Sequence, residues 1–268
     1  MRSKTLHFAF SAALAFGALL LPQSSFATPV SGAFGIEGGG AGAIGFSLNF
    51  QCASGLSRAF PCPTTTSGNF LTTQGIGDFS PYIGQGGFIE SLSPIVAPPN
   101  TNVNLMNFIT FSSSGAPNPV TTPDIALDLN KVLLGTEGPS ECGLPAAPGQ
   151  NCTPQGIPQL VNPNNPLGIS VFNFSNTQTG TTVSFSVNGT ARRLSTGETS
   201  NFDGVFTANF VGTNYQALFA ALNAGLTIQT PYSGTFIATA VPEPSTIPLV
   251  LGGLLVLAGV SLRRPFRR

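Results

Sequence analysis

The sequence Thr-Val-Ser-Phe-Ser-Val at residues 182–187 alternates strictly between small polar and large apolar side chains. Successive side chains of a strand point to opposite sides, so Val183, Phe185 and Val187 would share one apolar face. The same alternation returns at residues 206–210. These two segments predict neighbouring strands that contribute to one core.

Short apolar stretches separated by turns rich in Gly, Pro and Asn extend this pattern along the chain. They cover residues 44–50, 69–73, 87–92, 105–111, 124–134, 169–174 and 232–240. About nine short strands of this kind predict an all-β fold, and we expect an antiparallel β-sandwich or a jelly-roll-like body. A flattened barrel is the alternative. The glycine-rich residues 28–45 are expected to form a loose segment before the first strand.

One segment has a helical pattern. Between Tyr215 and Leu222 apolar residues recur at the spacing i, i+3, i+4 and i+7. Asn214 is a suitable N-cap and Gly225 a suitable stop. The sequence therefore predicts one short helix within the body.

The strand predicted at residues 124–134 places Asp124 and Asp128 on a face that we expect to be wet. Two residues four apart on one face of a strand are roughly 13 Å apart, which exceeds the usual separation of the two carboxylates in a glycosidase. We therefore expect solvated carboxylates at these positions. A secreted glycan-active hydrolase is kept as an alternative to a body without catalysis.

Four cysteines form two pairs with identical spacing: Cys52 with Cys62, and Cys142 with Cys152. Three connectivities are open, and the repeated spacing favours two local disulfides formed in an oxidising compartment. The competing interpretation, a zinc site of four thiolates, is disfavoured because structural zinc sites space their thiolates by about two to four residues. The second pair lies in residues 135–166, where seven prolines predict irregular structure.

The N-terminus has the pattern of a secretory signal peptide. Arg2 and Lys4 precede an apolar run over residues 8–21, and small residues follow at Ser25 and Ala27. This order predicts export by the general secretion machinery and cleavage by signal peptidase after Ala27. An uncleaved anchor helix is the alternative.

Removal of the two ends would change the charge of the chain. Residues 28–243 contain four basic and all ten acidic residues, which gives a formal charge of −6. An acidic body without a basic stripe argues against nucleic acid as a partner. The only histidine, His7, would leave with the signal peptide. We therefore expect neither a histidine-dependent enzyme nor a cofactor, and we predict that the body is not an enzyme.

A proline-flanked carboxylate, Pro242-Glu243-Pro244, follows the last predicted strand. Each proline fixes its own φ and biases the preceding residue toward extended conformations. A stiff extended strip loses little entropy on binding, which suits recognition by a processing enzyme.

An apolar segment and a basic end complete the tail. Residues 247–262 are sixteen residues without charge, which as a helix would span roughly 24 Å of a hydrocarbon core of about 30 Å. We expect a single transmembrane helix whose basic end stays on the cytoplasmic side. That end contains four arginines: Arg263, Arg264, Arg267 and Arg268.

In this order, the triplet, the apolar helix and the terminal arginines of residues 241–268 resemble the PEP-CTERM sorting domain. The resemblance implies recognition by exosortase, a membrane-embedded cysteine transpeptidase-like enzyme of Gram-negative bacteria. It also implies transient anchoring in the inner membrane, removal of the tail near residues 242–244, and delivery of the body to the cell surface or an exopolysaccharide matrix. The alternatives are an ordinary membrane anchor for the tail and a glycan-binding adhesin for the body.

Overall fold

The structure is a computed structural model that describes residues 28–44, 47–50, 67–112 and 123–240. The predicted signal peptide, the Cys52–Cys62 pair and the whole predicted sorting tail lie outside these described residues. Within them, no helix is long and apolar enough to cross a membrane.

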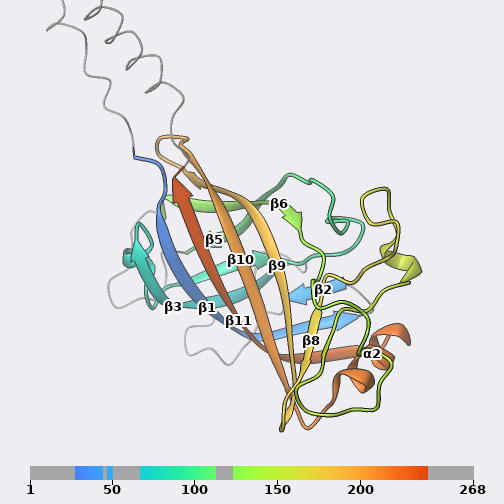
Figure 1. The fold of residues 1–268 in the computed structure, drawn as a ribbon. Coiled ribbons are helices and arrows are strands. Elements are labelled where there is room, and N and C mark those ends of the chain that lie inside the picture. The colour runs from blue at the N-terminus through green and yellow to red at the C-terminus, as the bar shows by residue number, and fades with distance from the viewer. Residues whose placement is uncertain (1–27, 45–46, 51–66, 113–122, 241–268) are drawn as a thin grey trace, which may run out of the picture.

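Eight antiparallel strands follow one another around a closed sheet in chain order, and the last pairs with the first. Figure 1 shows the long strands of this barrel side by side. The eight are β1 (Gly32–Ile44), β3 (Ser67–Gly77), β4 (Gly86–Glu90), β5 (Leu105–Phe111), β6 (Ile125–Val132), β9 (Gly180–Arg193), β10 (Thr199–Val211) and β11 (Thr227–Ala240).

The remaining elements are short and lie in the connections. They are β2 (Ser47–Phe50), η1 (Ser80–Tyr82), β7 (Asn151–Cys152), η2 (Pro158–Leu160), β8 (Asn173–Asn176) and α2 (Tyr215–Asn223). At one end of the barrel β1 pairs with β2 instead of β3, and β9 pairs with β8 instead of β6. No ladder joins β2 to β8 in the described part of the chain, so the sheet opens at this end.

Within the described residues, the antiparallel all-β architecture with one short α-helix is confirmed, but the expected sandwich or jelly roll is replaced by the alternative, a barrel. The difference comes from residues 28–45, where the expectation of a loose segment was wrong. Strand β1 occupies most of this segment and pairs with β11 from Gly32↔Ala238 to Ile44↔Thr227. Gly38 has a packing role in this strand, because a Cβ atom there would collide with the ring of Tyr232.

The inside of the barrel is filled largely by aromatic rings. Phe34 stacks on Phe236 with ring centroids 4.8 Å apart, and Phe185 stacks on Phe206 at 4.7 Å. The alternation predicted for residues 182–187 is therefore confirmed, since its apolar side chains lie in this core. Such pairs add about 0.5–1.5 kcal/mol each beyond the burial of their area.

Strand β6 corrects a second expectation. Its pairing with β9 shifts register between Leu129 and Lys131, which explains why Lys131 interrupts the alternation in the sequence. The face expected to be wet is partly covered, and Asp128 is buried. The alternation of the sequence alone does not predict this burial, because Arg192 of β9 bonds to Asp128 and to Asn107 of β5 across this face.

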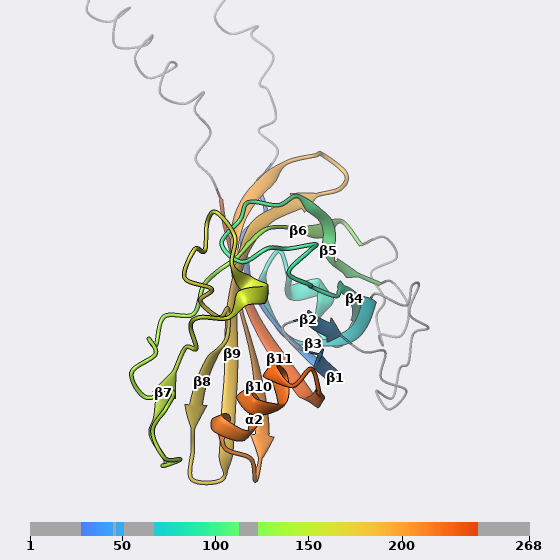
Figure 2. The same ribbon diagram turned by 90° about the vertical axis from the view of Figure 1, so that its right-hand side faces the viewer.

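The predicted helix is confirmed as α2. The side chain of Asn214 accepts a hydrogen bond from the Ala217 N–H, and Gly225 follows the helix with a φ of 70°. Tyr215, Leu218 and Leu222 form its buried face. The helix lies at the open end of the barrel (Figure 2).

Candidate functional sites

The end of the barrel that contains Thr28 and Ala240 carries an ion cluster centred on Arg193. Its guanidinium lies 3.0 Å from a carboxylate oxygen of Asp78 and 3.4 Å from one of Asp124. Its Nε donates to the backbone oxygen of Thr28 at 3.3 Å. Asp78 in turn accepts from the Ser31 N–H at 2.7 Å. The Arg193 side chain therefore links the start of the described chain to the turn after β3 and to the residue before β6.

A second ion pair lies on the wall of the barrel. Arg192 Nε donates to Asp128 at 3.0 Å, and Arg192 also donates to the side-chain oxygen of Asn107 at 3.1 Å. Asn107 has a φ of 58°, which a non-glycine residue seldom adopts. Its backbone N–H donates to Asp128 at 2.6 Å, so the carboxylate stabilises the irregular backbone of β5.

The carboxylate of Asp124 is held in its charged form. Partial burial alone would raise its pKa, but hydrogen bonds from Ser195 and from Arg193 outweigh burial and hold the pKa of Asp124 below its usual 3.8. A general acid needs a carboxyl group that keeps its proton near neutral pH. Asp124 has the opposite character, and its contacts with Arg193 and Ser195 suit an ion-pair role at this end of the barrel.

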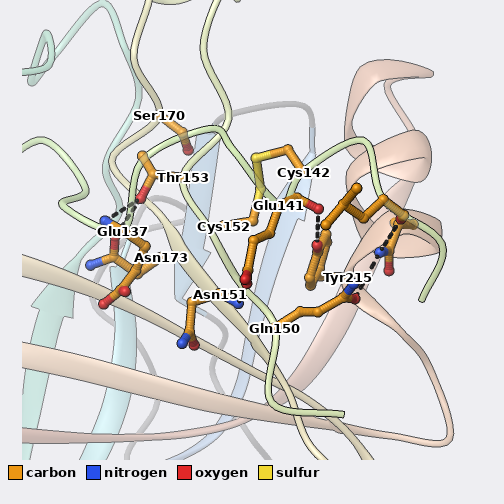
Figure 3. The surroundings of a disulfide bond; sticks show 12 residues. Glu137, Glu141, Cys142, Gln150, Asn151, Cys152, Thr153, Ser170, Asn173 and Tyr215 are labelled. Atoms are coloured by element: carbon orange, nitrogen blue, oxygen red, sulfur yellow. Dashed lines mark hydrogen bonds between the residues drawn. A yellow bond between two sulfur atoms is a disulfide. The ribbon is translucent and has the colours of Figure 1, made fainter. Parts of the chain in front are cut away.

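The loop predicted to be irregular carries the Cys142–Cys152 disulfide, which confirms that pair. Figure 3 shows the Tyr215 hydroxyl beside this disulfide, where it donates to the backbone oxygen of Glu141. On the other side, the hydroxyl of buried Thr153 donates to Asn173 at 2.6 Å. The disulfide loop is thus attached to both α2 and β8.

An apolar cavity of about 40 Å³ lies where the sheet opens. Phe50 of β2, Phe174 of β8 and Leu222 of α2 are among its lining residues. Sites for drug-sized molecules are roughly 300–1,000 Å³. The cavity is therefore a packing gap beneath α2 and has no room for such a ligand.

The structure separates some predicted residues and brings other residues together. Asp124 and Asp128 do not converge, because each contacts a different arginine. Arg192 and Arg193 were not predicted as site residues. Their signal in the sequence is that they are adjacent charges in a chain where only 7% of residues are charged. The described residues contain no group of three or more metal-ligating side chains.

Comparisons with known proteins give no relative: no protein-family model, no curated protein and no solved structure matches this chain.

Proposed function

We propose that this chain is an exported, non-enzymatic protein of the cell surface or of an exopolysaccharide matrix. Its C-terminal tail, read as a PEP-CTERM signal, holds it at the inner membrane until exosortase cleaves near residues 242–244. Signal peptidase, the secretion machinery and exosortase are then its processing partners, and a Gram-negative cell envelope is its setting.

One observation carries the proposal: the folded unit fits between the two predicted signals. Strand β1 begins at Gly32, five residues after the expected cleavage at Ala27, and β11 ends at Ala240. Both ends of the described chain lie at the same end of the barrel, because Gly32 pairs with Ala238. Loss of both signals would therefore remove no strand of the barrel.

The body also offers little support for catalysis. The carboxylates of Asp78, Asp124 and Asp128 each contact an arginine, and the apolar cavity has no acidic residue in its lining. These contacts disfavour the hydrolase alternative, in which two carboxyl groups would face an open cleft.

The proposal is tested by changing the tail motif in cells that contain exosortase. The variant Pro242→Ala, Glu243→Gln, Pro244→Ala should keep the tail, and the wild type should lose it, as measured by the intact mass of the exported protein. A matched control replaces Glu137 by Gln and the exposed Pro139 and Pro145 by Ala, and should be processed like the wild type. Equal tail retention in the motif variant and the wild type would refute the sorting proposal.

A further inference from the structure

A surface depression of about 280 Å³ lies at the end of the barrel opposite Thr28 and Ala240. Three turns that are distant in sequence form it: residues 146–148 of the disulfide loop, 176–180 between β8 and β9, and 212–214 before α2. Its volume is close to the lower limit of roughly 300 Å³ for small-molecule sites. One unit of a longer chain would fit there.

The chemistry of this depression is polar but uncharged. None of its lining residues is Asp, Glu, Lys, Arg or His. Gln178 and Thr179 are exposed, and in the described part of the chain their side chains make no hydrogen bond as donors or acceptors. They supply a carboxamide and a hydroxyl, which both donate and accept. Ala147 and Pro148 supply an apolar patch beside these groups.

The walls of the depression are fixed by hydrogen bonds between the turns. The Gly149 N–H donates to the backbone oxygen of Asn176, and the Gly212 N–H donates to that of Thr179, both at 2.7 Å. The buried side chain of Asn176 accepts from the Tyr215 N–H at 2.9 Å. The disulfide also restrains the first turn, so the backbones of the three turns are held in a defined arrangement. The protein would then lose less backbone entropy on binding a ligand than a flexible site would.

The same contacts disfavour an anion at the start of α2. The Tyr215 N–H is already bonded to Asn176, and the Ala217 N–H is bonded to Asn214. A phosphate or carboxylate would therefore find neither a cation nor these helix donors. A ligand rich in hydroxyl groups, with an apolar ring face, matches the carboxamide, the hydroxyl and the Pro148 patch better.

We propose that this depression binds one residue of an uncharged polysaccharide. The inference rests on the proposed function, since a matrix protein requires a matrix partner, and it assigns that partner to a site. The depression lies at the end of the barrel away from the membrane signals, where a polysaccharide chain can reach it. No aromatic residue lines it, so each site binds weakly.

The test uses the full-length chain in detergent and measures binding by titration calorimetry and by amide shifts of residues 176–180. The probes are cellohexaose, maltohexaose and chitohexaose, with hexagalacturonate as the charged counterpart. Loss of one hydrogen bond of about 1 kcal/mol weakens binding about 5-fold, so the double variant Gln178→Ala, Thr179→Val should bind about 25-fold more weakly. The control Gln155→Ala, Thr239→Val changes the same residue types at exposed positions elsewhere and should bind like the wild type.

Binding of at least one neutral oligomer that the double variant loses and the control keeps would support the site. Three results would overturn it: no binding of any neutral oligomer, equal binding by the double variant, or equal binding of hexagalacturonate. Circular dichroism verifies that the variants are folded. Removal of the tail is measured separately by mass, so failure of the sugar site leaves the sorting proposal standing, and failure of sorting leaves the binding result interpretable.

Discussion

Replacement of Arg193 by Gln should destabilise the barrel by about 2 kcal/mol. At N···O distances of 3.0 and 3.4 Å, each charge pair attracts by roughly 5 kcal/mol at an effective dielectric constant of about 20, but desolvation and side-chain ordering offset most of it. Exposed pairs contribute about 0–1 kcal/mol, and breaking a buried pair costs about 3–5 kcal/mol. The side chains of Arg193, Asp78 and Asp124 are 18%, 30% and 33% exposed, which places the cluster between these cases.

Chemical and thermal unfolding followed by circular dichroism measure this effect. For a domain of this size, about 2 kcal/mol lowers Tm by about 4–8 °C. Lys131→Gln is the matched control, because it also removes one positive charge but breaks no ion pair among the described residues. Hydrogen exchange at the Ser31 amide should also accelerate in the Arg193 variant, since that amide is bonded to Asp78. Equal stability of the two variants would refute a structural role for the cluster.

The pH dependence gives an independent test of the same cluster. The folded pKa of Asp124 is depressed below 3.8, so the stability it contributes is present above that ordinary value and is lost as the pH falls through the lower folded pKa. The wild type should therefore lose stability with acid more steeply than Arg193→Gln in this range. Parallel curves for the two proteins would contradict the assignment.

Three further predictions concern the rest of the body. The double variant Cys142→Ser, Cys152→Ser should lose about 3 kcal/mol of unfolding free energy through loop entropy, measured by denaturant titration; a stability equal to that of the wild type would contradict this. Burial raises the pKa of Tyr232, so the folding stability that Tyr232 contributes is full below its ordinary pKa of about 10 and is lost at higher pH. The chain has three tyrosines, and the last part of the phenolate absorbance should appear only together with unfolding. Ionisation of all three tyrosines in the folded protein would contradict this. Glu243 lies three residues after Ala240, so about 10 Å of extended chain separates the motif from the barrel. A flexible insertion after Ala240 should therefore speed tail removal, as measured by a pulse-chase experiment. Unchanged kinetics would show that the folded body does not restrict the access of exosortase to the motif.

The sequence predicts a strand or helix of this fold well where the spacing of apolar residues and the flanking turn or capping residues indicate the same element. The alternation at residues 182–187 and the capped helix after Asn214 both depend on neighbouring residues, and both are confirmed. The disulfide between Cys142 and Cys152 follows from close spacing in a proline-rich loop. Each of these features is decided within a short stretch of chain.

Closure of the barrel depends on distant partners and could not be predicted in this way. Glycines in residues 28–45 suggested a loop, but Gly38 is required where the ring of Tyr232 packs on β1. Burial of Asp128 depends on Arg192, 64 positions along the chain. The surface depression likewise combines three turns that are distant in sequence, residues 146–148, 176–180 and 212–214. Local patterns do not specify which strands pair or which loops meet.

In the proposed function, this barrel is the exported product that remains once both predicted signals are removed. The most direct measurement is the intact mass of the protein collected outside cells that contain exosortase, compared with cells that lack it. With exosortase, the mass should correspond to a chain that begins at Thr28 and ends near residues 242–244. A product that keeps the apolar segment at residues 247–262 with or without exosortase would contradict the claim.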